Sequence, residues 1–514
     1  MPLIRPNRKT LVLVDPPYYR LYKPTYSLTR YPLSLGYLAS QVRRQMDWNV
    51  VVYNADFTPK SEPYQVRYLS GAGFANYLAN LGNPTAEVWQ QAAAVIASYA
   101  PDVVGISCKS QTFASALVLA RLVRQSNRSA RIIIGGPHAA MVGSQILRHD
   151  EVDIVVRGEG EQTLVELLAA IQTGADLAAV PGIAFRRDGQ IVETPARPLL
   201  DELDSLPYPH ESAATSLHDY DLYPREAFSH VFATRGCPYN CFFCGSRTIW
   251  GRHVRYRSAA NVAAELERLM ARGITRVHFD DDTFGVRPDY IAELCEAIQR
   301  RCPHLAWSCE LHVNLISDET IARMARAGCQ SIQLGIESGN DGILVQIRKG
   351  FTIDRAIAAA DTIRRHGIEV QAFFMVGFPQ ETEATLADTL AAMRRIRGLL
   401  SYSIFTPYPG TEAFDDCRAR GLIRGDFDPA RFNHQSPENC FCEHIKPRQF
   451  RALVARIEAM VDRNNAPGAL ARILSRRLSV REAVGKAWRR LARKSKIPNS
   501  KFQTSTKSQN SNLS

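Results

Sequence analysis

Three cysteines, Cys237, Cys241 and Cys244, are the residues of this 514-residue chain whose type and spacing most directly suggest chemistry. They follow the pattern C-x3-C-x2-C, and the next cysteine along the chain is Cys295. Three closely spaced thiolates can each hold one iron of a cubane cluster and leave the fourth iron free to bind and reduce a small molecule. A structural zinc site, the main alternative besides unrelated thiols, is closed by four Cys or His ligands. The spacing therefore predicts an iron–sulfur cluster with one open iron.

Strand-like apolar runs alternate with helical patterns from residue 228 to residue 440. The runs expected to be strands are residues 229–234, 276–280, 305–310, 331–336, 369–376 and 399–405. Each run ends in a polar or Gly-rich cluster, and the three cysteines follow the first run. Active sites of parallel barrels lie at the carboxyl ends of the strands. We therefore expect the cysteines and the polar clusters to share one edge of a sheet.

With Phe243 directly before the third cysteine, the motif resembles that of the radical SAM superfamily. The resemblance implies a partial (β/α)6 barrel over residues 228–440 and a [4Fe–4S] cluster on the three cysteines. It also implies S-adenosyl-L-methionine (SAM), cleaved to a 5′-deoxyadenosyl radical. The positions matching SAM contacts are Phe243 and Gly377 for the adenine, Asp281 and Asp282 for the ammonium, and Glu310, Glu337 and Ser338 near the ribose and carboxylate. For the two aspartates, helix capping is the structural alternative.

The first part of the chain also alternates strand and helix patterns. The expected strands are residues 10–14, 48–53, 102–107, 130–136 and 152–156, with helices at residues 33–44, 92–99, 114–125 and 162–172. This order predicts a parallel, doubly wound, Rossmann-like α/β sheet, whose ligands bind at the carboxyl ends of the strands.

This part, over roughly residues 8–190, resembles the cobalamin-binding domain that precedes many radical SAM domains. The residues that the resemblance places toward cobalamin are Asp56, Thr58, Ser107, Gly135, Gly136, His138, Gly158 and Glu159. Thr58 stands where cobalt-ligating domains of this kind carry a histidine, so the resemblance implies cobalt without a protein imidazole; His138, the nearby alternative, is on another loop. Two alternatives to cobalamin binding stay open. The glycines could serve only to form turns, or the whole domain could bind no corrin.

The formal net charge of +12 is concentrated at the C-terminal end. Residues 447–514 hold 16 Lys and Arg against 3 Asp and Glu, so the rest of the chain is close to neutral. A nucleic-acid partner is therefore not expected. The sequence predicts a basic amphipathic helical region at residues 441–496 and a disordered tail at residues 497–514. The basic region could pack on the protein, dock on a membrane surface or contact a nucleic acid or peptide.

These observations predict the organisation 1–190 cobalamin-binding domain, 191–227 linker, 228–440 radical SAM core, then the basic region and tail. Neither a membrane-spanning stretch nor a signal peptide is evident, and the cysteines are odd in number and scattered, so we expect a cytoplasmic enzyme. A low-potential donor such as flavodoxin or ferredoxin would supply electrons. A further group that could bind a second metal comprises Cys417, His434, Cys440 and Cys442.

The combined resemblance implies methylation of an unactivated carbon of a small molecule, lipid or natural-product precursor, with methylcobalamin as the methyl donor. Protein side chains in such an enzyme bind and orient the cofactors and exclude water. One alternative is a radical SAM oxidative cyclase or ring-rearranging enzyme of the same architecture, which the run from Trp250 to Arg257 also resembles. Another is a corrinoid or redox sensor.

Overall fold

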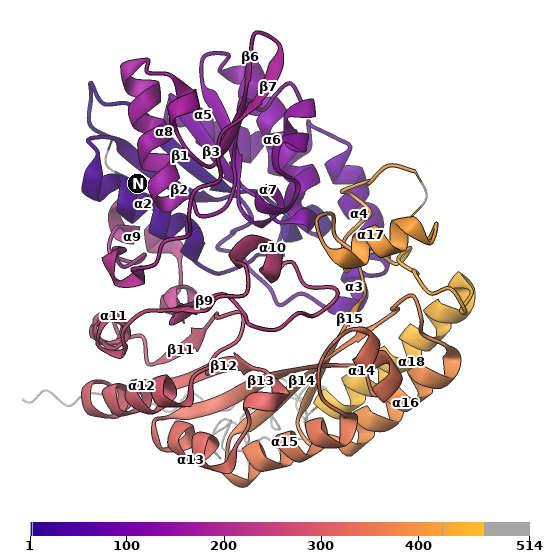
Figure 1. The fold of residues 1–514 in the computed structure, drawn as a ribbon. Coiled ribbons are helices and arrows are strands. Elements are labelled where there is room, and N and C mark those ends of the chain that lie inside the picture. Colours follow the sequence, from indigo (N-terminus) through magenta and orange to yellow (C-terminus); the bar gives the residue numbers. More distant parts are fainter. Residues whose placement is uncertain (1, 3, 424, 467–514) are drawn as a thin grey trace, which may run out of the picture. The chain divides into compact units, whose positions relative to one another are not determined.

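The computed structural model describes residue 2, residues 4–423 and residues 425–466 (Figure 1). Residues up to Glu458 pack as one unit, and a second unit begins at Ala459. Most of the basic region and the whole of the C-terminal tail therefore lie outside the described residues. Among those that are described, no helix is both long enough and apolar enough to span a membrane.

The N-terminal sheet has seven strands in the order β2-β1-β3-β4-β5-β6-β7. The first five are parallel, as the sequence predicts, and the last two run antiparallel. The strands are β1 Thr10–Asp15, β2 Asn49–Asn54, β3 Val103–Ser107, β4 Arg131–Gly135, β5 Ile154–Val156, β6 Ile183–Arg187 and β7 Gln190–Glu193. The order reverses direction between β1 and β3, which is where doubly wound sheets open a crevice for ligands.

The β6–β7 hairpin is an addition that the sequence analysis did not predict. Its turn is Asp188-Gly189, with φ of +51° and +78°. An Asp-Gly pair with both residues at positive φ is a preferred two-residue hairpin turn, because its twist matches that of the strands. This dipeptide was therefore an available signal for an antiparallel edge.

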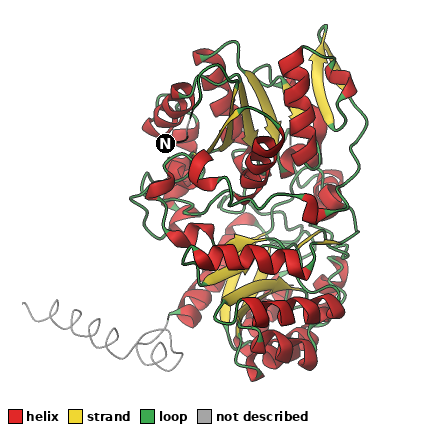
Figure 2. Ribbon diagram, turned by 90° about the vertical axis from the view of Figure 1, so that its left-hand side faces the viewer, coloured by secondary structure: helices red, strands yellow, loops and turns green. Residues whose placement is uncertain are grey.

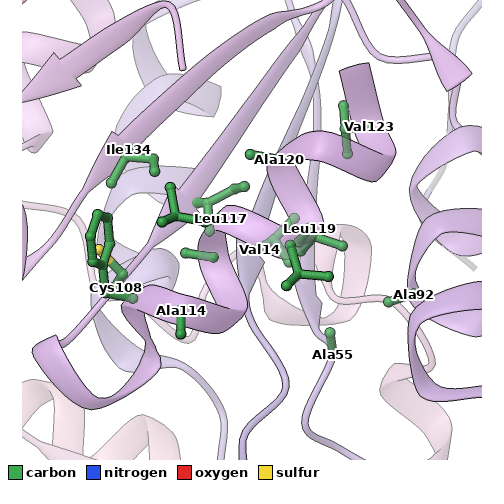
Figure 3. Close-up of a cluster of buried hydrophobic side chains, with 14 of the residues drawn as sticks. Val14, Ala55, Ala92, Cys108, Ala114, Leu117, Leu119, Ala120, Val123 and Ile134 are labelled. Atoms are coloured by element: carbon green, nitrogen blue, oxygen red, sulfur yellow. The ribbon is translucent and has the colours of Figure 1, made fainter. Parts of the chain in front are cut away.

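Helices cover both faces of the N-terminal sheet, and α2 packs with α8 while α5 packs with α6. The helices are α1 Tyr19–Tyr22, α2 Leu33–Gln45, α3 Val66–Leu69, α4 Ala72–Leu81, α5 Glu87–Ser98, α6 Phe113–Ser126, α7 Pro137–Val142 and α8 Glu161–Thr173. Figure 3 shows part of the core, to which α6 contributes Leu117, Leu119 and Ala120, near Val14 and Ile134 of the sheet. Each fully buried Leu or Ile contributes about 1.5–3 kcal/mol.

The connector after β7 returns to the free edge of the first sheet. It contains α9 Ala213–Ser216, and Leu217 forms an isolated bridge with Val52 of β2. The backbone N–H of His218 donates to the Val52 carbonyl at 2.8 Å.

The second sheet has six parallel strands in the order β15-β14-β13-β12-β11-β8 and is open between β15 and β8 among the described residues. The strands are β8 His230–Val231, β11 Arg276–Phe279, β12 Ala306–Leu311, β13 Cys329–Glu337, β14 Glu369–Val376 and β15 Leu399–Ile404. The expected strand at residues 229–234 is divided: β8 joins this sheet, whereas β9 Thr234–Arg235 pairs with β10 Arg255–Tyr256. The cysteine loop leaves directly from this small antiparallel ribbon.

The helices from residue 246 on are α10 Ser246–Trp250, α11 Ala259–Ala271, α12 Pro288–Arg301, α13 Asp318–Arg326, α14 Asp341–Gln346, α15 Ile353–Arg365, α16 Glu383–Arg395, α17 Glu412–Ala419 and α18 Pro447–Asn465. Of these, α11, α12, α13, α15 and α16 lie along the chain between strands of the second sheet and cover it (Figures 1 and 2). Among the helices from α10 to α18, five begin at a Ser or Thr whose hydroxyl accepts a backbone N–H of the first turn, namely Ser258, Ser317, Thr352, Thr382 and Thr411. Such caps are worth about 1 kcal/mol each and fix where the helix starts.

Candidate active site

The three cysteines lie in the loop between β9 and α10, at the carboxyl end of the second sheet. Gly236, just before the first cysteine, has φ of +104°, and a Cβ there would lie 2.4 Å from the carbonyl oxygen of His253. Only glycine fits this turn, so the loop departs from β9 in a fixed direction. Cys237 and Cys241 are half-buried and Cys244 is exposed, with the Ser246 N–H donating to its Sγ at 3.4 Å.

The donor set fits a cubane cluster better than a single ion. Among the described residues, no three His, Cys, Asp or Glu side chains gather at a point where one metal ion could bind. A zinc site needs that convergence, whereas each cysteine of a cubane holds a separate iron. Burial raises the pKa of Cys237 to about 11 and that of Cys244 to about 12, so both thiols keep their protons until a metal replaces them.

The suggested second metal site is not supported. Cys417, His434, Cys440 and Cys442 all lie within the described residues, and no three of them gather around a common point. The Cys440 thiol instead donates to the carbonyl oxygen of Ile445 at 3.7 Å. Within the described residues, this group therefore does not form a site for a single metal ion.

A buried lysine that the sequence analysis missed lies beside the cysteine loop. Lys349 is 5% exposed and donates to Glu337 at 3.2 Å. It also interacts electrostatically with Cys241 and Cys244. A fixed positive charge at this place would offset the negative charge of a thiolate-bound cluster.

The two candidate aspartates after β11 have different surroundings. Asp281 is 1% exposed, and its two oxygens accept from the Ala233 N–H and the Thr234 hydroxyl, both at 2.8 Å. These bonds hold the backbone that leads into the cysteine loop. Asp282 is exposed to solvent, yet surrounding protein desolvates it and raises its pKa. Asp281 uses both oxygens on protein donors, whereas Asp282 is exposed, so the geometry favours Asp282 over Asp281 for the SAM ammonium.

The other candidate SAM residues lie at the ends of neighbouring strands. Glu310 of β12 is exposed and interacts electrostatically with Asp282 and Glu337. Glu337 ends β13 with φ of +72° and is followed by the fully buried Ser338. The strands therefore bring five of the predicted positions, Asp281 included, to one edge of the sheet. Phe243 lies nearby, with its ring 5.8 Å from that of Phe378.

Gly377 belongs to a turn that the protein holds with a buried carboxylate. Glu381 accepts from the Gly377 N–H at 2.5 Å and the Phe378 N–H at 3.1 Å. Glu381 is fully buried, and desolvation raises its pKa to about 7. One residue, Gln380, separates Glu381 from the run Gly377-Phe378-Pro379. This nearby carboxylate was a signal that the sequence analysis did not use.

At the carboxyl edge of the first sheet, some of the residues predicted to contact cobalamin have free space beside them, and others are in close contact with protein atoms. Gly158 has φ of +79° and no atom within 4 Å of where a Cβ would be, so the space beside it is free. Gly136, at φ of +94°, lies against Ser107 and Cys108, and a Cβ there would be 2.9 Å from the Ser107 hydroxyl. Gly135 precedes it at the end of β4. The Ser115 hydroxyl is buried without a partner in the described structure.

Asp56 and Thr58 shape the loop after β2. Asp56 is 2% exposed and accepts from the Tyr18 N–H at 2.8 Å and the Arg20 N–H at 3.0 Å, which fixes the first turn of α1. The Thr58 N–H donates to the hydroxyl of Ser27 at 3.0 Å. Asp56 and Thr58 therefore stabilise the loop after β2 by hydrogen bonds within the protein.

His138 is buried and neutral. It is 2% exposed, and its Nδ1 lies 3.0 Å from the Ser110 hydroxyl. Its ring lies 4.2 Å from Phe113 and 6.1 Å from Phe427. Burial lowers its pKa to about 3. Protein contacts therefore fix the position of the His138 ring.

Glu159 joins the two halves of the chain through a group of buried charges. Its oxygens accept from Arg235 at 2.6 Å and Arg255 at 2.8 Å, and Glu161 accepts from Arg235 at 2.6 Å. The ring of Trp250 lies 5.7 Å from both guanidinium groups. We call these five residues the seam. Arg235 is two residues before Cys237, so the seam ties the loop after β5 to the start of the cysteine loop.

A second contact lies on the other side of the cysteine loop. A Cβ at Gly245, just after Cys244, would lie 2.7 Å from the Met141 sulfur of α7, and one at Gly410 would lie 2.7 Å from the Met141 Cβ. The Thr248 hydroxyl donates to the Gly410 carbonyl at 3.0 Å. The loop after β4 is thus packed directly on the cysteine loop and on the loop after β15.

Arg30 completes the connection between the two sheets. It pairs with Asp280 after β11 and interacts electrostatically with Asp15, at the end of β1, and Glu310, at β12. Burial lowers the pKa of Arg30 to about 10. The carboxyl edges of the two sheets therefore border one shared polar region.

Comparison with known proteins agrees with this arrangement. Residues 231–393 match the radical SAM superfamily, and residues 24–168 match the B12 binding domain. The chain therefore contains a B12 binding domain followed by a radical SAM domain. The radical SAM domain implies a [4Fe–4S] cluster and SAM, and the B12 binding domain before it implies cobalamin.

Relatives share most of the chain. It is 29% identical to an uncharacterised methyltransferase of Pyrococcus horikoshii, over 80% of this chain and 84% of the relative. It is 26% identical to the anaerobic magnesium-protoporphyrin IX monomethyl ester cyclase of Rubrivivax gelatinosus, over 74% of this chain and 70% of that relative. The radical SAM methyltransferase TsrM from Kitasatospora setae has a similar fold, with a TM-score of 0.63, 17% identity and 83% coverage of both chains. The cobalamin-dependent enzyme OxsB has a TM-score of 0.67 and 16% identity, and the match covers 95% of this chain and 71% of OxsB.

Proposed function

We propose that this chain methylates a carbon atom of a small molecule, a class that includes lipids and natural-product precursors. When bound, the cluster and SAM supply hydrogen-atom abstraction, and cobalamin supplies methyl transfer. The observation that carries the proposal is the packing of Met141 against both Gly245 and Gly410. It sets the loop after β4, on the corrin side, against the cysteine loop.

The chain's own residues have binding and orienting roles in this proposal. Cys237, Cys241 and Cys244 would hold the cluster. Asp282 and Glu310 would bind SAM, with Phe243, Glu337, Ser338 and Gly377 near it. Ser107, Gly135, Gly136 and Gly158 would lie against the corrin. Five other predicted residues form hydrogen bonds to protein groups in this structure. They would hold the cofactor-contacting residues in position and are Asp56, Thr58, His138, Glu159 and Asp281.

The test uses anaerobically purified protein, reconstituted with iron, sulfide and cobalamin and supplied with SAM and a strong reductant. Bound iron and corrin are quantified first, and then 5′-deoxyadenosine and S-adenosylhomocysteine by mass spectrometry. We expect both nucleosides from the native chain and neither from the triple variant Cys237→Ala/Cys241→Ala/Cys244→Ala. Cys302→Ala removes a buried thiol far along the chain from the motif and is the matched control. A native chain that holds corrin and forms only 5′-deoxyadenosine, even with substrate, would refute methylation.

The second candidate is a non-methylating radical SAM cyclase, which the similarity to the Rubrivivax gelatinosus enzyme favours. A methylase forms S-adenosylhomocysteine in step with product, whereas a cyclase forms 5′-deoxyadenosine without it. The same mass-spectrometric assay therefore separates the two functions.

We further infer that the enzyme works in the cytoplasm with a flavodoxin- or ferredoxin-type electron donor. Membrane contact through residues 441–496 is a separate proposal, and most of that region lies outside the described residues. Removing residues 468–514 and comparing sedimentation with anionic and neutral liposomes would test it. Equal sedimentation of the full and shortened chains would rule it out.

A further inference from the structure

A cavity of about 550 Å³ lies beside the cysteine loop. Its wall comes from the connector, the cysteine loop, the residues that lead into β10, and the loop between β11 and α12. The residues used below are Asp201, Pro238, Arg252, His253, Arg255 and Arg287. Cavities of this size hold small-molecule ligands. Because Pro238 directly follows Cys237, the cavity adjoins the cluster ligands.

The lining is cationic. Three arginines and a histidine surround one aspartate, Asp201. Arg287 is partly compensated by its pair with Asp289. Arg252 donates only to the carbonyl oxygen of Pro238, at 3.3 and 3.4 Å, and among the described residues no carboxylate lies within 4.0 Å of it. Its charge is therefore free to act on a ligand.

Arg255 adds a buried, incompletely bonded guanidinium. It is 4% exposed, and its Nη1 donates to Glu159 at 2.8 Å and to the Leu200 carbonyl at 2.6 Å. Its Nε and Nη2 are buried without an acceptor in the described structure. The Trp250 ring near this guanidinium cannot replace in-plane acceptors. Leaving buried donors unpaired costs about 1–3 kcal/mol, and a ligand oxygen would remove that cost.

A second cavity, of about 270 Å³, gives a useful contrast. It is lined by Arg268 and Arg272 among others, but Arg268 pairs with Glu211 and Arg272 donates to the Tyr220 hydroxyl. Its lining also includes the carboxylates of Glu211 and Glu265, which offset the arginines and would repel an anion. Unpaired cationic donors distinguish the cavity beside the cysteine loop.

We infer that the cavity beside the cysteine loop binds an oxyanion, a phosphate or carboxylate group, of the substrate. A guanidinium presents parallel N–H donors that match such groups. Arg252 at the surface and Arg255 at the inner end would contact different oxygens of the same ligand. The anion site stands on its own geometry, whereas its assignment to the substrate rests on the proposed function.

The test measures ligand binding rather than turnover. Phenyl phosphate is titrated calorimetrically into the cluster- and cobalamin-loaded protein, so that the phosphate of the corrin is already in place. Phenol, at chloride-matched ionic strength, is the uncharged control. We expect phenyl phosphate to bind and phenol not to bind. Arg252→Gln should weaken binding at least about tenfold, the effect of losing one charge-assisted contact.

Arg276→Gln is the matched control variant, because Arg276 is an exposed arginine at the opposite end of β11 and should leave binding unchanged. Iron and corrin content of both variants should equal those of the native chain. SAM should not displace phenyl phosphate; displacement would mean that the cavity receives the SAM carboxylate and would overturn the inference. Binding that is absent, or equal in Arg252→Gln, would also overturn it. A native chain that binds phenyl phosphate but forms no S-adenosylhomocysteine would refute methylation and leave the anion site standing.

Discussion

Replacing Arg235 by glutamine should loosen the connection between the two sheets. The change removes two charge-assisted hydrogen bonds and leaves the carboxylates of Glu159 and Glu161, whose side chains are 6% and 10% exposed, short of a partner. Removing one partner of a buried ion pair costs about 3–5 kcal/mol. At about 2 °C per kcal/mol for a domain of roughly 200 residues, the melting temperature should fall by about 6–10 °C.

The functional consequence follows from the position of the seam. Because Arg235 fixes the cysteine loop against the loop after β5, its loss should misalign SAM cleavage and methyl transfer. We expect more 5′-deoxyadenosine per S-adenosylhomocysteine, while iron content stays at the native level. Arg235→Lys keeps the charge but loses the fork of donors, so it should lie between the native chain and Arg235→Gln.

A double-mutant cycle with Glu161→Gln separates the seam from damage to the cysteine loop. Glu161 is far from the cysteines in sequence and touches them only through Arg235. The melting-temperature changes of the two single variants should not add in the double variant, with a coupling energy of about 1 kcal/mol or more. Additive effects, or an unchanged nucleoside ratio in Arg235→Gln, would refute the reasoning.

Three further sets of substitutions test other parts of the site. Asp282→Asn should weaken SAM binding about tenfold or more with little loss of stability, whereas Asp281→Asn should mainly lower the melting temperature; calorimetric titration and thermal unfolding measure the two effects. Desolvation raises the pKa of Asp56 to about 7, so between pH 4 and 7 the folded chain keeps a proton that the unfolded chain releases, and stability falls as pH rises through this range. Asp56→Asn should remove that part, so its melting temperature relative to the native chain should rise from pH 5 to pH 8, by the equivalent of about 3 kcal/mol at most. Gly245→Val should clash with Met141 and lower the retained corrin and the nucleoside yield together, and Met141→Ala in the same chain should partly restore both.

Each of these expectations has a clear counter-result. Equal SAM affinity in the two aspartate variants would remove Asp282 from the SAM site. A melting-temperature difference that stays constant with pH would show that Asp56 is ionised in the folded chain. Retention of corrin by Gly245→Val would show that the Met141 contact is dispensable.

Much of the fold follows from local sequence pattern. Residues 369–376 were expected as one strand and form β14 with the same limits, and every second residue from Val370 to Val376 is buried, as in a strand with one face on the core. The helix expected at residues 114–125 forms α6, Phe113–Ser126, which is one residue longer at each end. The cysteine motif is equally local, since its ligands lie within one loop.

The contacts that join the two halves depend on positions distant in sequence. Glu159 was assigned to the corrin because it follows β5, yet its partners, Arg235 and Arg255, lie after the connector. A carboxylate at a strand end is equally suited to a ligand or to an arginine, and only the fold decides between them. Lys349 is a similar case, because nothing in its neighbourhood along the chain indicates burial beside the cysteines.

The seam has a consequence for recombining such proteins. A chimera that takes residues 1–190 from one relative and the remainder from another would import Glu159 and Glu161 without guarantee of matching arginines. Unmatched carboxylates buried at the junction would penalise the hybrid even if both parents are stable. The crossover should therefore not separate the five residues of the seam. All of them should come from the same parent, namely Glu159, Glu161, Arg235, Trp250 and Arg255.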